Sequence, residues 1–278
     1  MIVTVTPKGK TKKRSFPFFV GTERGIAGGR CYFPPDVVFF QQKDKRDGEG
    51  PVRKELPHFS VGQSYGGNQE WFPERWMRIG GCGAVTACDL CIYLAKYKAM
   101  PALYPFDADR VSREDYLAFG RIMRAYLGPR LLGIHKTQTF VDGFRDYLAG
   151  TGARPVRLRG ISGEEDVETA STAIREGIDS GFPVPYLMLR HRDEELQDYT
   201  WHWFLLNGYD DSGGGFSVKA VTYGESRWLD LRRLWRTGRR KKGGFVLVRP
   251  AGAKDGVPYA ATRRVPSDSA RFPETYSP

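Results

Sequence analysis

The sequence predicts an α+β protein in which helices come first and strands follow. Apolar residues recur mainly at helical spacing between about residues 82 and 181, and alternation with a period of two dominates between about residues 183 and 249. Glycine and proline interrupt the chain between these segments. With 278 residues, 40% of them hydrophobic, the chain is long enough to bury a large core.

Composition excludes several other classes of protein. The hydrophobic share and the 13% aromatic content are too high for a largely disordered chain, and no apolar run approaches the ~20 residues of a membrane helix. Residues 1–14 show no apolar stretch followed by a cleavage site, so we expect a cytoplasmic protein without a membrane partner. In that compartment the four cysteines are expected to be reduced thiols.

The net charge of +11 is concentrated in two short segments. Lys8–Arg14 and Arg232–Lys242 hold twelve of the 43 basic residues and no acid, which leaves 31 basic against 32 acidic residues elsewhere. A nucleic-acid partner is therefore not expected, because such proteins distribute basic residues along a binding face. The second segment is either a solvated edge or, if it lies near a substrate cleft, a surface that attracts acidic peptide segments.

The chain divides into three parts by composition. Residues 1–68 are irregular, with short β-like pieces at Ile2–Thr6 and Val37–Phe40, and we expect an N-terminal extension packed on the core. Residues 69–250 hold the periodic segments and form the main domain. Residues 251–278 are rich in Pro, Ser and Arg, which is typical of a loose strap or disordered tail.

Helical periodicity predicts four helices, at Cys82–Tyr97, from Ser112 to about Leu127, at Thr139–Leu148, and from Ser162 to near Gly181. Ser112 with Asp115, and Ser162 with Glu165, resemble capping boxes. Alternation predicts strands at Arg154–Arg159, Pro183–Arg190, Trp201–Tyr209, Phe216–Thr222 and Gly244–Arg249. A short helix is expected at Leu229–Trp235.

Cys82 is the residue best placed to be a nucleophile. It lies in the segment Gly80–Gly83, at the predicted start of a long apolar helix. Unpaired N–H groups and the positive end of the helix dipole favour a thiolate there, so we expect a lowered pKa for this thiol. The flanking glycines allow a substrate backbone to approach closely.

His202 is the histidine best placed to act as a base. It is one of only four histidines and lies in a strongly β-like segment, which would hold an imidazole rigidly. A nucleophile at the start of a helix and a base on a strand 120 residues later is an arrangement suited to nucleophilic catalysis.

Four segments carry a resemblance to a known family: Gly81–Ala87 (GCGAVTA), His202–Asp210 (HWFLLNGYD), Val221–Gly224 (VTYG) and Gly243–Val248 (GGFVLV). In their order and spacing they resemble papain-like cysteine peptidases, and within that superfamily the bacteriocin-processing double-glycine peptidases and their bacterial relatives. The resemblance covers about residues 69 to 249. It implies a papain-like fold in which a central helix carries the cysteine and an antiparallel sheet carries the histidine.

By this resemblance Cys82 is the nucleophile and His202 the general base. The family also places a glutamine upstream of the cysteine to bind the oxyanion, for which Gln69 is the candidate and Gln63 a weaker one. The distance from Gln69 to Cys82 along the chain is longer than the family pattern.

The third position of a triad departs from the family pattern. Relatives place an Asn or Asp there to orient the histidine, whereas this chain has Val221. Thr222 is the polar neighbour that we expect to replace it, and Glu225 is a less suitable one. Tyr223 would occupy the aromatic position that shields the histidine.

Simpler interpretations compete at each position. Cys82 alone resembles a small core residue, and His202 alone resembles a core histidine with satisfied hydrogen bonds. The aromatic residues Trp71, Trp76, Trp201, Trp203 and Tyr223 either line a cleft or fill the core, and the core interpretation is favoured.

Cys88 and Cys91 form a Cys-x-x-Cys pattern inside the predicted helix, with no second ligand pair, so we expect packed thiols rather than a metal site. No glycine-rich segment matches a phosphate loop, and we expect no cofactor.

The favoured hypothesis is a cysteine hydrolase, a peptidase or amidase, that acts on a peptide or another amide or acyl substrate through an acyl-enzyme. An acyltransferase would use the same pair of residues with an amine or thiol in place of water. A catalytically inactive binding protein of the same fold is the third alternative, which the apolar Val221 favours. No pattern in the sequence indicates an oligomeric state.

Overall fold

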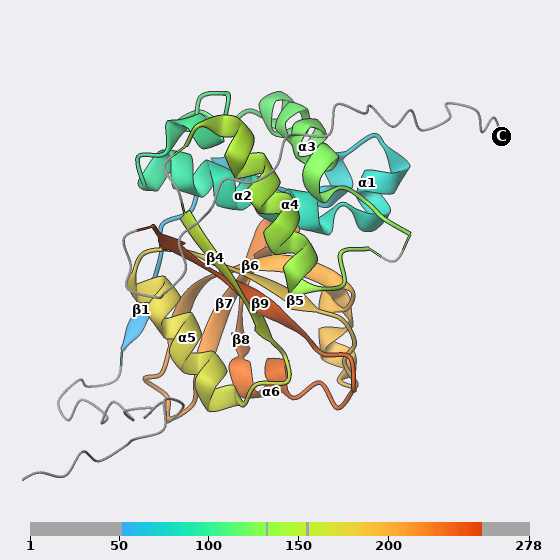
Figure 1. Ribbon diagram of the computed structural model, residues 1–278. Coiled ribbons are helices and arrows are strands. Elements are labelled where there is room, and N and C mark those ends of the chain that lie inside the picture. The colour runs from blue at the N-terminus through green and yellow to red at the C-terminus, as the bar shows by residue number, and fades with distance from the viewer. Residues whose placement is uncertain (1–51, 132, 154–155, 252–278) are drawn as a thin grey trace, which may run out of the picture. The chain divides into compact units, whose positions relative to one another are not determined.

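A computed structural model of the chain describes residues 52–131, 133–153 and 156–251. The described part is an α+β structure built on a seven-stranded sheet in which every recorded strand pair is antiparallel (Figure 1). The main helices are α1 (Arg75–Gly80), α2 (Cys82–Tyr97), α3 (Arg113–Leu127), α4 (Thr137–Thr151), α5 (Val167–Asp179) and α6 (Leu231–Trp235). Within these ranges, every helix is too short or too polar to cross a bilayer.

Six strands follow the order β4-β9-β5-β6-β7-β8, and β1 pairs with β6 as the seventh. Their bounds are β1 Arg53–Glu55, β4 Val156–Ser162, β5 Val184–Met188, β6 His202–Asp210, β7 Ser217–Thr222, β8 Glu225–Asp230 and β9 Gly243–Pro250. A separate two-stranded hairpin is formed by β2 (Ser60–Val61) and β3 (Ser64–Tyr65).

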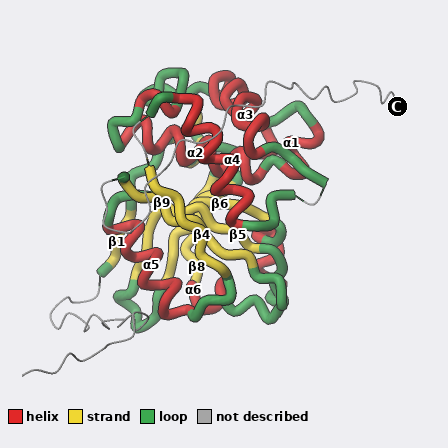
Figure 2. Tube along the Cα trace, in the orientation of Figure 1, coloured by secondary structure: helices red, strands yellow, loops and turns green. Residues whose placement is uncertain are grey.

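Helices cover both faces of the sheet (Figure 2). On one face Phe140 of α4 stacks on Trp203 of β6, with ring centroids 4.4 Å apart. On the other face Trp235 of α6 packs against Phe245 of β9, with ring centroids 5.7 Å apart. Neighbouring residues of a strand point to opposite faces, so β6 contributes large side chains to both layers of the core.

The helix α2 is the central helix of the structure. Every residue from Cys82 to Leu94 is buried, because the helix lacks a polar face and packs against both α3 and β6. Its bounds match the helix predicted at Cys82–Tyr97. The sole charged residue in that buried stretch is Asp89.

The predicted helix starts are right in one case and wrong in another. Ser112 caps α3 by accepting a hydrogen bond from the Asp115 N–H, as its capping box indicates. Ser162 does not cap α5, because it is still part of β4 and pairs with Gly244. Asp166 caps α5 instead, by accepting a hydrogen bond from the Thr169 N–H.

The five predicted strands are present with end shifts of a few residues, and β8 was missed. β8 is largely exposed and polar, so it lacks the alternation that identifies a strand. It follows β7 through Tyr223 and Gly224, whose φ values of 54° and 76° are those of a tight hairpin turn. The structure thus places the edge of the sheet next to the residues predicted to support His202.

The N-terminal extension is described only from residue 52. Its last part, through β1, belongs to the sheet itself, since Glu55 pairs with Gly208 of β6. The strands proposed at Ile2–Thr6 and Val37–Phe40 and the tail from residue 252 lie outside the described residues.

Replacing Phe140 by alanine tests the packing of α4 on β6. Phe140 is fully buried against Trp203, so Phe140→Ala leaves a cavity and is expected to lower the free energy of unfolding by about 3–5 kcal/mol. Urea denaturation followed by circular dichroism measures the change. The control Ile122→Ala removes a partly exposed side chain of α3 and is expected to change it by less than about 1 kcal/mol. Equal effects of the two variants would contradict this packing.

Candidate active site

Cys82 opens into a cavity at the start of α2. The helix begins directly after Gly81, and no side chain caps it. The Cys82 side chain is 9% exposed, at the edge of a cavity of about 200 Å³. The cavity is lined by Trp76, Ile79, Gly80, Cys82, Pro129, Arg130, Leu131, Gly133, Ile134, Leu187, Leu189 and Trp201.

The rim of this cavity is apolar and exposed. Trp76, Ile79, Leu131 and Trp201 are 71%, 63%, 99% and 46% exposed. Within the described residues only two other large hydrophobic side chains, Ile122 and Tyr223, are comparably exposed. A cluster of exposed apolar side chains around a thiol indicates a binding surface. The core interpretation is therefore correct for Trp203, but Trp76 and Trp201 line the cavity.

The Cys82 sulfur lies against the backbone on both sides of His202. The thiol donates a weak hydrogen bond to the Trp201 carbonyl at 4.0 Å. The N–H groups of Trp203, Gly83 and Cys82 itself donate toward the sulfur. Three backbone donors around one sulfur atom form a pocket suited to negative charge.

Burial nevertheless raises the pKa of the Cys82 thiol, because desolvation of the thiolate outweighs the three N–H donors. The lowered pKa expected from the helix start and the flanking glycines is therefore wrong. The reason is burial. The sulfur lies where α2 packs against β6, and little solvent is near to stabilise a charge.

The imidazole of His202 is held by two consecutive residues. Nε2 lies 2.6 Å from Thr222 Oγ1 in a hydrogen bond. The Tyr223 ring stacks on the imidazole, with ring centroids 4.6 Å apart and an angle of 2° between the ring planes. Val221 is buried and pairs with Leu205, so it makes no polar contact with the histidine. The structure thus brings Thr222, and not Val221, into hydrogen-bond contact with the imidazole.

Burial lowers the pKa of His202 to about 4, so the ring is neutral at pH 7. The hydroxyl of Tyr223 lies 3.5 Å from Nδ1, and burial raises the pKa of Tyr223 to about 12. No hydrogen bond joins the Cys82 thiol to the imidazole among the described residues. In this state the cysteine and the histidine are a neutral pair, each held by other partners.

Residues 65–68 hold the turn that carries Tyr223 through hydrogen bonds. Asn68 Nδ2 donates to the Tyr223 carbonyl at 2.9 Å, and the Gly224 N–H donates to the Gly67 carbonyl at 2.9 Å. These bonds hold Tyr223 in a left-handed conformation, φ 54°, that L-residues otherwise disfavour. The loop therefore determines where the partner of the imidazole ring lies.

Asp89 anchors the same loop to α2, and sequence reasoning missed it. Its carboxyl group accepts hydrogen bonds from the Gly67 N–H at 3.2 Å and from the Tyr116 hydroxyl at 2.7 Å. Burial raises the pKa of Asp89 to about 7. The available signal was a single acidic residue inside an otherwise apolar helical run.

Gln69 and Gln63 do not line the cavity. Gln69 is buried, its Nε2 donates to the Arg78 carbonyl at the end of α1, and its Oε1 has no partner among the described residues. Gln63 is exposed in the turn between β2 and β3. An oxyanion role for Gln69 stays a prediction.

Cys88 and Cys91 are buried within α2, as expected of packed thiols. Burial raises the pKa of both thiols well above the usual value. Across the described ranges, no group of three or more His, Cys, Asp or Glu side chains is arranged to hold a metal ion.

Comparisons with protein-family models, with curated proteins and with solved structures find no match for this chain. A fold class alone does not specify an activity. Function is therefore inferred from the chemistry of the Cys82 cavity and its surroundings.

The raised pKa of Cys82 predicts the pH profile of its alkylation. Because only the thiolate reacts, the rate with iodoacetamide is expected to rise continuously through pH 9 without a plateau below pH 8. Peptide mapping by mass spectrometry identifies the labelled residue, and fully buried Cys88 and Cys91 in the same helix serve as internal controls. A plateau near pH 6 would show that the thiol is ionised after all.

Asp89 predicts a pH dependence of stability. Its pKa is about 3.8 in the unfolded chain and about 7 in the folded protein, so the folded state binds the proton more tightly. Stability from this group is fully present below pH 4 and is lost as the pH rises toward 7. Relative to Asp89→Asn, which retains an acceptor oxygen, the native protein is expected to lose stability over this range, measured by urea denaturation. A pH-independent difference would contradict the prediction.

Proposed function

We propose that this protein is a cysteine hydrolase that cleaves a peptide or another amide bond through an acyl-enzyme on Cys82. One observation carries the proposal: the Cys82 sulfur lies at the uncapped start of a buried helix, opens into an apolar cavity, and touches the backbone on both sides of His202. The nucleophile thereby opens into the substrate space, and the residue that carries the base lies between the two backbone groups that the sulfur contacts.

The arrangement of elements supports a papain-like fold. A central helix begins with the cysteine, and the antiparallel sheet packed against it carries the histidine at the start of β6. The resemblance of the sequence motifs to papain-like peptidases points to the same assignment. Thr222 takes the orienting position in place of an Asn or Asp.

In the proposed acylation step, the Cys82 sulfur attacks the carbonyl carbon of the substrate and its proton passes to His202. Since Nε2 is held by Thr222, Nδ1 is the nitrogen that receives the proton. The S–C bond forms as the carbonyl becomes an oxyanion, which the N–H groups around the sulfur stabilise. The proton then moves to the leaving nitrogen and the C–N bond breaks.

In the proposed deacylation step, water attacks the thioester while His202 takes its proton. The C–S bond breaks, the acid is released, and the proton returns to the sulfur. Both groups begin and end neutral, which agrees with the raised pKa of the thiol and the lowered pKa of the imidazole. An added amine in place of water would give the acyltransferase reaction.

The second candidate function is binding without catalysis. It is favoured by one observation, the lack of a hydrogen bond between the Cys82 thiol and the His202 imidazole among the described residues. A cavity with an apolar rim would then bind a polypeptide that the protein does not cleave.

Turnover of a peptide library distinguishes the two functions. We expect cleavage products by mass spectrometry with the native protein and their loss with Cys82→Ser, because the hydroxyl is a poorer nucleophile than the thiol. Cys88→Ala, which changes another thiol of α2 outside the cavity, is the matched control and is expected to retain activity. Binding of library peptides without cleavage by the native protein would establish the non-catalytic function instead. Added hydroxylamine captures the acyl group as a hydroxamate and tests for the acyl-enzyme.

Thr222→Val tests the positioning role of Thr222. The variant keeps the shape of the side chain but removes its hydrogen bond to His202 Nε2, so kcat is expected to fall by about 10- to 100-fold with little change in KM. Thr222→Ser restores the hydroxyl and is expected to rescue most of the activity and the pH profile. Equal losses in both variants would indicate a structural role only.

A further inference from the structure

The loop between α6 and β9 lies directly beside the wall of the Cys82 cavity. Two residues of that wall, Leu189 and Trp201, are joined by a backbone hydrogen bond of 3.0 Å. The Leu189 N–H also belongs to this network, donating to the Lys242 carbonyl at 3.1 Å. Three residues further along, the Arg192 N–H donates to the Thr237 carbonyl at 3.0 Å. The basic segment 236–242 is therefore tied to the cavity wall at Lys242, and at Thr237 to Arg192, three residues beyond that wall.

This loop and its neighbours form a basic patch, which we define as Arg190, Arg192, Arg236, Arg239, Arg240 and Lys241. All six side chains are exposed, and none of them forms an ion pair with a described carboxylate. Nearby cations are already neutralised: Arg233 pairs with Asp193 and Glu195, and Arg232 pairs with Glu168. The positive charge of the patch is thus available to a partner.

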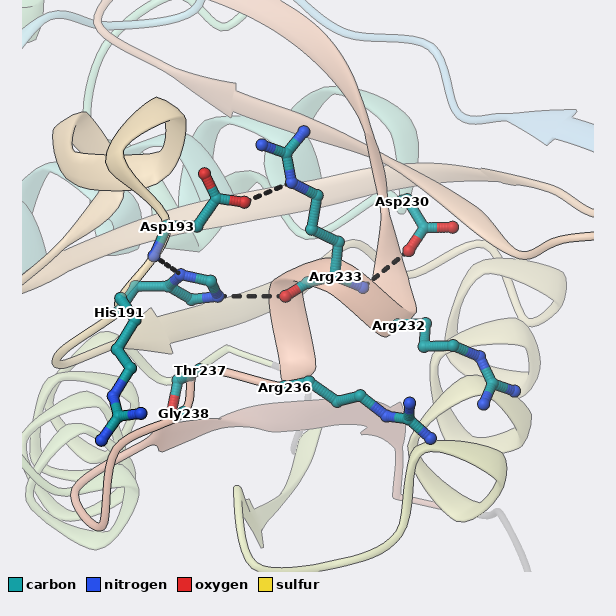
Figure 3. A pocket seen from close by; sticks show the side chains of 9 residues that line it. His191, Asp193, Asp230, Arg232, Arg233, Arg236, Thr237 and Gly238 are labelled. Carbon is teal, nitrogen blue, oxygen red and sulfur yellow. Dashed lines mark hydrogen bonds and ion pairs between the residues drawn. The ribbon is translucent and has the colours of Figure 1, made fainter.

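The patch adjoins a hollow of about 530 Å³ that is centred on α6 (Figure 3). His191 forms a hydrogen bond with the Arg233 carbonyl at 3.0 Å, which fixes this side of the hollow. In Figure 3 the Arg233 side chain turns toward Asp193, while the guanidinium groups of Arg232 and Arg236 extend away from it. The hollow therefore exposes the guanidinium group of Arg236 beside a backbone frame held by the His191 hydrogen bond.

Arg190 connects the patch to the cavity. Its guanidinium carbon lies 5.9 Å from the centre of the Trp201 ring, which forms part of the cavity rim. Leu189 and Arg192 are three residues apart, so their Cα atoms are separated by at most about 11 Å. A chain that leaves the cavity past Trp201 therefore meets Arg190, the first cation of the basic patch, within a few residues.

We propose that the preferred substrate is a polypeptide that carries an acidic segment within a few residues of an apolar segment. The apolar part occupies the Cys82 cavity and its rim, and the acidic part contacts the basic patch. This inference rests on the proposed function in one respect, that the Cys82 cavity receives the substrate. Acidic side chains match the patch because a local excess of one charge raises the concentration and the association rate of the opposite charge.

A nucleic acid fits the patch less well. Glu194 lies on the exposed segment close to Arg192, and the continuous negative charge of a phosphate backbone would be repelled there. A peptide places its carboxylates at selected positions and avoids this acid.

Binding to the Cys82→Ser protein tests the inference without requiring turnover. The probes are fluorescein-labelled peptides that share one apolar centre. Two of them carry four glutamates, either before or after that centre, and their controls carry four glutamines at the same place. We expect the better glutamate peptide to bind about tenfold more tightly at low salt, and the advantage to disappear near 1 M salt, where the Debye length is about 3 Å. Fluorescence anisotropy measures both affinities.

The triple variant Arg192→Gln, Arg236→Gln, Arg239→Gln is expected to abolish the preference for glutamate. The matched control Arg110→Gln, Arg113→Gln, Arg124→Gln removes the same charge from exposed positions in and just before α3 and is expected to retain it. Equal affinities for glutamate and glutamine peptides would overturn the inference, as would tighter binding of a single-stranded oligonucleotide than of the glutamate peptide.

The same peptides separate failure of the inference from failure of the proposed function. If the native protein cleaves glutamate and glutamine peptides with equal kcat/KM, the hydrolase stands and the acidic preference is wrong. If no peptide is cleaved but the glutamate preference depends on the patch, the hydrolase is wrong and the binding surface stands.

Discussion

The burial of α2 against β6 is the constraint on which the rest of the structure depends. An apolar helix with every residue from Cys82 to Leu94 enclosed can pack only in the centre of the molecule, between α3 and the sheet. This packing presses the first residue of the helix against the start of β6, which is where His202 lies. The site is therefore a consequence of the core and is positioned as rigidly as the core.

The same burial determines the electrostatics of the site. Desolvation raises the pKa of the Cys82 thiol and lowers that of the His202 imidazole, so neither is charged at neutral pH. An ion pair is thus not the ground state, and in the proposed reaction the proton has to move when a substrate is attacked. The three N–H donors around the sulfur supply stabilisation at the point where negative charge would develop.

The support of the imidazole depends on a chain of contacts from α2 back to the sheet. Asp89 holds Gly67, the 65–68 loop holds the turn at Tyr223 and Gly224, and that turn places Thr222 and Tyr223 on the ring. A buried carboxyl group in α2 is therefore connected to the histidine through backbone hydrogen bonds. The connection gives the one acid of an otherwise apolar buried stretch a structural role.

Periodicity and local chemistry predicted the helix at Cys82 and the strand at His202, because each depends on residues close together in the chain. The polar neighbour Thr222 was predicted from the family resemblance. These signals did not predict β8, the cap at Asp166 or the role of Asp89. β8 lacks alternation, the cap at Asp166 lies four residues beyond the predicted start at Ser162, and the partners of Asp89 lie 22 and 27 positions away. The predicted direction of the Cys82 pKa shift was also wrong. The helix start favours the thiolate, but desolvation of the buried sulfur outweighs it and raises the pKa.

By itself the sequence determined the α+β class, the order of the elements and the two residues on which the chemical proposal depends. Only the tertiary structure decided how deeply the thiol is buried, what surrounds it and which surface adjoins the cavity. The physical reason is that helix and strand formation follow local periodicity, whereas desolvation and charge depend on atoms brought together from distant parts of the chain. The basic segment 232–242 shows this most clearly: its charge is visible in the sequence, but its contact with the cavity wall through Leu189 is visible only in the fold.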